Sequence, residues 1–225
     1  MTTRQMDLFI RHCDKYFGQK NEQVIHPTAM NEFHIDILLY GPNDKFPYWK
    51  MVTMGASDYK MPSAKGAIAR QNEYIMLIDK DADMNDKDTA LWYCQKLWMI
   101  SRYSFANKIS ITYGHSIEWK NEDEADEMVA AFIEFPQMFD YGILHYKSGL
   151  FTDIACLLVV LLNKDDFDRL VKIGPQQFSE YLFPEDGNAH KHFLSERNRS
   201  KKFCISFKGF ILRRKFFGCP SKSSE

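Results

Sequence analysis

The chain lacks any apolar run long enough to cross a membrane. Its most apolar segment, Ile154 to Leu162, has nine residues, whereas a helix that spans a bilayer needs about 20. The first segment, Met1 to Arg11, mixes charged and polar side chains with few apolar ones, so it does not have the pattern of a secretory leader. We therefore expect no membrane span and a cytoplasmic location, and we interpret residues 154–162 as a buried strand.

Cysteine is scarce and unpatterned. The chain has five cysteines, and no two of them form a CxxC pair. An odd, scattered set argues against a disulfide framework. Cys94 lies in a helical pattern and Cys156 in the apolar run, so both are expected to be small buried hydrophobic residues.

Sequence motifs for catalysis and cofactor binding are also missing. There is no GxSxG elbow, Walker phosphate loop, GxGxxG or HExxH. The aspartates of residues 79–88 resemble a calcium loop, but Met84 replaces the required glycine and Ala90 the last acidic ligand. His190 and His192 have no third ligand at a useful spacing. We therefore expect no cofactor and no metal, and we predict that the aspartates cap the following helix.

The composition is that of a globular protein, with an uneven distribution of charge. Of the 225 residues, 45% are hydrophobic and 15% aromatic, which is enough for a sizeable core. The net charge of −1 hides a basic segment, residues 197–225, with nine basic residues and one acid. This segment carries +8 and the rest of the chain −9. An acidic body favours basic partners and disfavours nucleic acid.

The hydrophobic periodicity predicts an α+β protein. Residues 1–197 are expected to form one domain, a mixed β-sheet with helices packed against it, and residues 198–225 a basic tail. Predicted helices cover residues 3–17, 89–105, 165–173 and 176–182. Predicted strands cover residues 33–40, 48–54, 73–78, 108–113, 128–135 and 152–162, with a further edge strand near Phe203 in the tail.

One set of residues could support acid–base chemistry. His34 and Asp36 point to the same face of a predicted strand, and His115 follows a strand end at Gly114. A histidine and an aspartate could act as base and acid in a hydrolase. The same residues could instead hydrogen-bond loops and lock the sheet edge, or they could anchor a binding groove.

Four segments, in this order, resemble the suppressor of fused family in its single-domain bacterial form. They are Phe33 to Ser57, Tyr113-Gly-His-Ser-Ile-Glu-Trp119, Phe135-Pro-Gln-Met138 and Cys156 to Leu170, and the resemblance covers roughly Ile25 to Arg197. It implies a binding protein rather than an enzyme. Animal members of the family sequester a zinc-finger transcription factor by clamping a peptide between two halves, and this chain resembles the N-terminal half.

The resemblance also implies a role and a binding surface. Bacterial single-domain relatives are proposed to be immunity proteins, so the expected partner is a protein, a basic toxin domain. A regulator that sequesters a nucleic-acid-binding protein is another possibility. Trp119 is expected to be the main anchor, because exposed Trp residues often dominate interfaces. The alternative is that Trp119 belongs to the core. The expected partner-binding residues are His34, Asp36, Thr53, Ser57, His115, Glu118 and Trp119.

Overall fold

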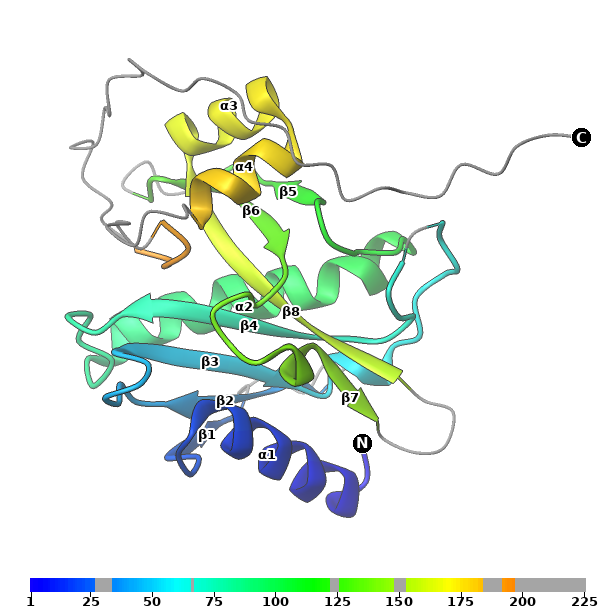
Figure 1. The fold of residues 1–225 in the computed structure, drawn as a ribbon, viewed down its shortest axis with the longest axis vertical. Helices are drawn as coiled ribbons and strands as arrows, with labels where there is room; N and C mark the ends of the chain where they lie inside the picture. Colours follow the sequence, from blue (N-terminus) through cyan, green and yellow to red (C-terminus); the bar gives the residue numbers. More distant parts are fainter. Residues whose placement is uncertain (27–33, 66, 122–125, 148–152, 184–191, 197–225) are drawn as a thin grey trace, which may run out of the picture.

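The computed structural model of the chain describes residues 1–26, 34–65, 67–121, 126–147, 153–183 and 192–196 (Figure 1). Its helices confirm the predicted ones to within two residues at each end. They are α1 (Thr3–Phe17), α2 (Lys87–Asn107), α3 (Lys164–Ile173) and α4 (Pro175–Leu182), with short 3-10 turns η1 (Ala56–Asp58) and η2 (Tyr141–Leu144).

The strands form one mixed sheet. They are β1 (Gln23–Ile25), β2 (Asp36–Tyr40), β3 (Tyr48–Met54), β4 (Asn72–Asp79), β5 (Ser116–Glu118), β6 (Met128–Glu134), β7 (His145–Lys147) and β8 (Asp153–Asn163). Their order is β1-β2-β3-β4-β8-β6-β5, and β7 pairs with the first part of β8. Strands β4 and β8 run parallel and all other pairs antiparallel. The predicted α+β class is confirmed.

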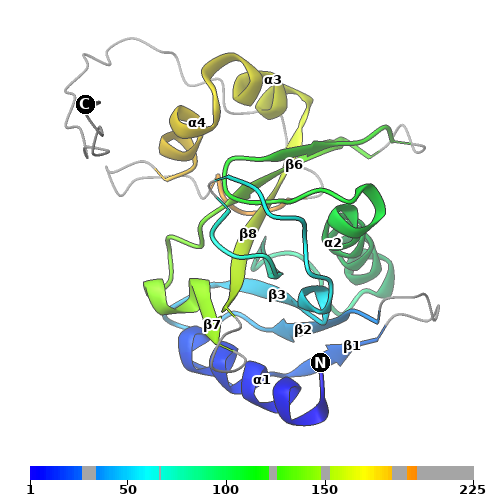
Figure 2. The same ribbon diagram turned by 90° about the vertical axis from the view of Figure 1, so that its right-hand side faces the viewer.

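Helices cover both faces of this sheet, so the core has two halves (Figures 1 and 2). On β8, Leu158 and Val160 contribute to the half under α1, α3 and α4, whereas Leu157 and Val159 contribute to the half under α2. Strand β8 is therefore buried on both sides, which explains why its sequence is a continuous apolar run.

Local side chains fix the helix ends. The Thr2 hydroxyl accepts a hydrogen bond from the backbone of Gln5, and the Gln5 side chain accepts one from the Thr2 backbone. Helix α1 ends at Gly18, whose φ of 69° suits glycine. The Asp86 carboxylate accepts from the Thr89 N–H at 2.9 Å at the start of α2. This contact confirms that an aspartate of the acidic run caps the helix.

Two sequence predictions near the sheet edges were wrong. Residues 108–113 are not a strand, because Lys108 turns the chain with φ 53° and the Ile111 carbonyl accepts its hydrogen bond from the Asn72 side chain at 2.8 Å. The strand of this region, β5, begins later, at Ser116. At the other edge, β1 lies at residues 23–25, where no strand was predicted.

A short segment after α4 also belongs to the core. Leu194 is buried, and the Ser195 N–H donates to the Leu77 carbonyl at 2.7 Å. The Ser195 hydroxyl accepts from the Leu161 N–H at 3.1 Å. Within the described residues, no helix is both long and apolar enough to cross a membrane. The predicted tail strand near Phe203, and His190, lie outside the described residues.

Candidate functional site

The sheet separates the predicted site residues into different places. Asp36 lies on β2 near one edge, and His115 precedes β5 at the opposite edge. Strands β3, β4, β8 and β6 lie between them. With about 4.8 Å between neighbouring strands, β2 and β5 are roughly 24 Å apart along the sheet. His34, Asp36 and His115 therefore do not form one catalytic set.

Strand β5 presents an open edge. Among the described residues it pairs only with β6, and the path of strands ends there. Trp119 N–H donates to Val129 and His115 C=O accepts from Ile133, so these odd-numbered residues bond to β6. In an antiparallel ladder the residues between them turn their backbone groups the other way. The N–H and C=O groups of Ser116 and Glu118 therefore point outward, away from β6.

The side chains of this edge are mostly polar and exposed. His115, Ser116 and Glu118 are exposed, whereas Ile117 is buried against the core under α2. This alternation holds β5 in register while it leaves one side of the strand to solvent. The structure thus brings together three of the predicted binding residues, His115, Glu118 and Trp119, on one strand and its end.

Trp119 is half-buried and joins β5 to α2. Its ring lies 5.0 Å from the Lys96 ammonium, and that ammonium is also 5.4 Å from the Trp92 ring. Lys96 forms an ion pair with Asp126 at 2.5 Å, with both side chains largely buried. The Trp119 indole N–H donates to Asn121 at 2.9 Å. Trp119 is therefore both part of the core boundary and part of the surface.

Thr53 and Ser57 lie in the interior, where they bind a buried carboxylate. Glu73 is fully buried and accepts five hydrogen bonds, two from the hydroxyls of Thr53 and Ser57 at 2.6 Å each. The other three come from the N–H groups of Gly55, Ala56 and Ser57. Burial raises the pKa of Glu73 to about 7, although these hydrogen bonds favour the charged form. Thr53 and Ser57 are not available to a partner in this structure.

The turn that binds Glu73 depends on glycine. Gly55 has φ 116°, and a Cβ there would lie 2.5 Å from the His34 carbonyl oxygen. Only glycine allows the chain to pass so close to β2 while it turns its N–H toward Glu73. One sign of this arrangement is visible in the sequence, the glycine that interrupts a strand, but nothing there indicates the buried acid.

A second carboxylate, Asp36, is bound by two histidines. Asp36 Oδ1 lies 2.7 Å from His26 Nδ1 and 2.8 Å from His34 Nε2. The Asp36 side chain is 3% exposed, whereas the His26 and His34 side chains are 64% and 53% exposed. Within the described residues these three form a group whose atoms could bind a metal ion. His26 was missed from sequence because it follows β1, which was not predicted.

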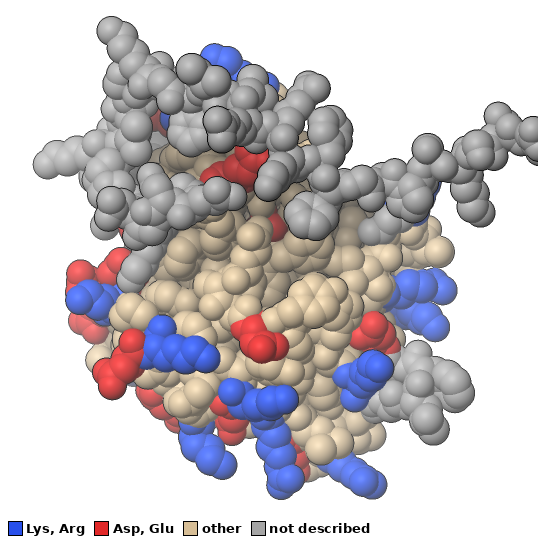
Figure 3. Space-filling view, in the orientation of Figure 1, with Lys and Arg blue, Asp and Glu red and all other residues tan. Residues whose placement is uncertain are grey.

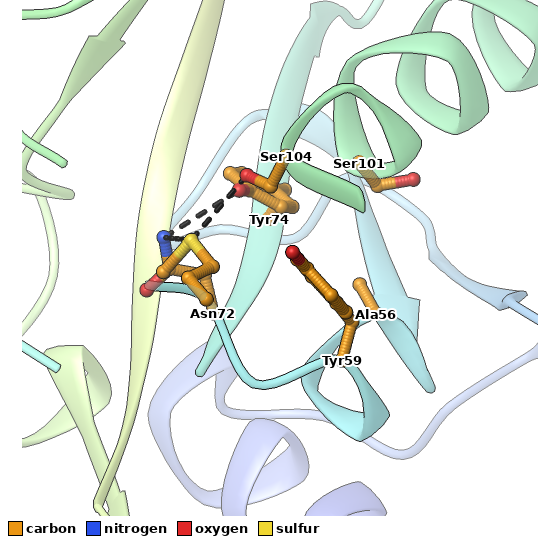
Figure 4. Close-up of a pocket in the computed structure, with 7 residues that line it drawn as sticks. Ala56, Tyr59, Asn72, Tyr74, Ser101 and Ser104 are labelled. Atoms are coloured by element: carbon orange, nitrogen blue, oxygen red, sulfur yellow. Dashed lines mark hydrogen bonds between the residues drawn. The ribbon is translucent and has the colours of Figure 1, made fainter. Parts of the chain in front are cut away.

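A narrow pocket lies between α2 and the sheet. Figure 4 shows residues that line this pocket, with Ser104 beside Tyr74. Asn72 also lines the pocket, and its side-chain amide donates to the Tyr74 hydroxyl at 3.4 Å. The side chains leave no space that would hold a water molecule.

Comparisons with known proteins identify the family. The model of the family described as suppressor of fused protein matches residues 31–189. The chain belongs to the suppressor of fused family. No curated protein sequence matches it. The match spans β2 to α4, so α1, β1 and the Leu194–Ser195 segment complete the core from outside the matched range.

Solved structures of suppressor of fused proteins share the fold. The crystal structure of the Sufu-Fu complex aligns with a TM-score of 0.63 at 12% identity, covering 87% of this chain and 91% of that one. A protein described as a suppressor of fused homologue from Neisseria gonorrhoeae gives 0.60 at 10% identity, covering 85% and 93%. Drosophila Suppressor of Fused gives 0.61 at 13% identity, covering 85% of this chain. The chain spans about half, 49%, of the Drosophila protein.

Proposed function

We propose that this suppressor of fused domain is a protein-binding module without enzymatic activity, and that it neutralises a toxin by covering it. The open edge of β5 is the observation that carries this proposal. Family membership supports it, because one structural relative was solved as a complex of Sufu with Fu. The separation of His34 and Asp36 from His115 counts against the alternative, a hydrolase that uses all three.

The partner would add a strand to the sheet. The outward N–H and C=O groups of Ser116 and Glu118 can pair with an extended segment of the partner, as in other cases of strand addition. The exposed side chains of His115 and Glu118 lie beside that segment and would select among partners. Trp119, at the end of the strand, would cover the rim of the contact.

Charge suggests a basic partner. Residues 1–196 carry a net charge of −9. Figure 3 shows acidic and basic side chains interspersed on one face, so the negative charge is not gathered into a single patch there. Its effect is then expected mainly on the rate of association, which should fall as salt is raised.

The test uses a proline on the open edge. Ser116→Pro removes the outward N–H but leaves the bonds of His115 and Trp119 to β6, and edge strands tolerate proline. The probe is the protein encoded immediately upstream of this chain. We expect the upstream protein to bind the wild type and Ser116→Ala with the same affinity. Its affinity for Ser116→Pro should be lower by about tenfold or more. Thermal melts of each variant check that the fold is intact.

Two results would overturn the proposed contact and the proposed lack of activity. Equal binding by folded Ser116→Pro and Ser116→Ala would show that β5 is not the contact. Turnover on general esterase, phosphatase or nuclease substrates that is lost in His115→Ala would favour an enzyme instead. If the upstream protein is toxic when expressed alone, and remains toxic with this chain present, the neutralising role is wrong.

A further inference from the structure

We propose that His26, His34 and Asp36 form a binding site for a divalent transition-metal ion of the Zn²⁺ type. The site lies at the β1–β2 edge of the sheet, opposite the β5 edge, and is independent of the proposed partner surface. No metal was expected from the sequence, in which His26 is separated from His34 and Asp36.

The register of the sheet brings the three side chains together. Ile25 of β1 pairs with Ile37 of β2, so the next residue along, His26, is directly opposite Asp36. Side chains that are opposite in an antiparallel pair point to the same face. His34 precedes Asp36 by two residues and shares that face. The cluster therefore follows from backbone pairing and does not depend on chance contacts of long side chains.

The backbone beneath the site is held by other parts of the fold. Trp98 of α2 donates its indole N–H to the Ile35 carbonyl, between the two ligands, at 2.8 Å. Gly55 lies against the His34 carbonyl on the other side. Asp36 itself pairs with Met54 in the sheet. Ligands held in place before the ion arrives lose less conformational entropy when it binds.

The distances suit one small ion. The three ligand atoms lie within 4.8 Å of one another. In a tetrahedral zinc site two ligand atoms are about 3.4 Å apart. The imidazole nitrogens, now 2.7 and 2.8 Å from Asp36 Oδ1, would each move away by about 0.6–0.7 Å. Both rings are more than half exposed, so they have room to do so.

The donor set selects the class of metal. Two imidazoles and one carboxylate suit Zn²⁺, Co²⁺ or Ni²⁺, whereas Ca²⁺ and Mg²⁺ prefer oxygen donors alone. Three protein ligands leave a coordination position open, and the exposed rings place that position at the surface. Another histidine–aspartate ion pair, His145 with Asp153 at 3.4 Å, has no such third ligand among the described residues.

The test measures metal binding by the full-length protein, purified without a histidine tag and treated with chelator. Zn²⁺ is titrated by calorimetry, and Co²⁺ is followed by its visible absorption. We expect one ion per chain in the wild type. The double variant His26→Ala/His34→Ala should have a metal affinity lower by about tenfold or more. Asp36→Asn should also bind the metal more weakly. His145→Ala, the matched control, should behave as the wild type.

Stability supplies a second readout. Zn²⁺ should raise the melting temperature of the wild type and of His145→Ala, but not that of the double variant. Because His26 and His34 are exposed, the double variant should fold even if Asp36→Asn does not. The proposal is overturned if the wild type shows no saturable binding, or if the double variant binds as tightly as the wild type. Neither result depends on a protein partner.

Discussion

Burial shifts the pKa values of two interior ionisable side chains, Glu73 and Lys50, toward neutral pH. Both are fully buried. Glu73 is surrounded by hydrogen-bond donors. The Lys50 ammonium contacts one carbonyl, that of Phe46, at 3.5 Å, and lies about as far from the Phe46 ring as from the Tyr48 ring, at 6.0 and 5.9 Å. The two residues should therefore respond to pH in opposite directions.

Glu73 should make the protein less stable as pH rises. Its pKa is about 7 in the folded protein and 4.5 as the reference value, so the folded state holds the proton more tightly. Its stabilising contribution is complete below about pH 4.5 and is lost as pH rises through 7, by about 3 kcal/mol in all. Urea unfolding of Glu73→Gln at several pH values should lack this decline. The exposed variant Glu118→Gln should keep it, and a parallel decline in Glu73→Gln would contradict the assignment.

Lys50 should make the protein more stable as pH rises, at a higher pH than the effect of Glu73. Burial lowers its pKa from 10.5 to about 8, so the unfolded state holds the proton more tightly. Wild-type stability should rise as pH increases from about 8 toward 10.5. Lys50→Met removes the buried charge and should be more stable at pH 7 by about 1 kcal/mol or more. This advantage should shrink near pH 10. An exposed control, Lys20→Met, should show neither effect. If Lys50→Met is less stable than the wild type, the buried ammonium is needed for stability.

At the scale of elements, the contact between β5 and α2 connects the proposed binding edge to the core. Lys96 of α2 lies between the rings of Trp92 and Trp119 and is paired with Asp126, which precedes β6. A cation placed over aromatic rings and shielded from water is attracted more strongly than an exposed one. The edge strand is short, so this cluster is expected to hold its end in place.

Trp119 and Lys96 should therefore be energetically coupled. Trp119→Ala should lower the free energy of unfolding by about 2 kcal/mol, less than the roughly 3–5 kcal/mol typical of a large buried aromatic residue. In a double-mutant cycle with Lys96→Ala, the coupling should be about 1 kcal/mol. Additive losses would mean that the ring and the ammonium do not interact. Binding of the upstream protein by a folded Trp119→Ala would separate its role in the interface from its role in stability.

The elements could be predicted from the sequence better than the site. Helix α1 has a clear apolar face, both α1 and α2 have capping residues, and β8 is a continuous apolar run, so their positions could be predicted. The strand predicted at residues 108–113 failed because the Asn72 side chain, distant in sequence, takes the place of a neighbouring strand. The site depends on strand order and register. Neither the pairing of His26 with Asp36 nor the burial of Thr53 and Ser57 against Glu73 follows from local pattern.

At the scale of the whole molecule, the family match and the folded core end at different places. The match ends at residue 189, but Leu194 is 1% exposed and Ser195 bonds to both β4 and β8. These contacts join the chain after α4 to the two central strands of the sheet. The basic segment, residues 197–225, lies outside the described residues, and residues 198–225 are predicted to be a tail beyond the domain.

Two C-terminal truncations should therefore differ in their effect on stability. Removing residues 201–225 should leave cooperative thermal unfolding, with a change in the free energy of unfolding within about 1 kcal/mol. Removing residues 190–225 instead takes away buried Leu194 and leaves the Leu77 carbonyl and the Leu161 N–H without Ser195. That loss should cost about 2–4 kcal/mol. Leu194→Ala in the full chain should reproduce much of this loss of stability. A large loss of stability on removing only residues 201–225 would show that the basic segment is part of the core.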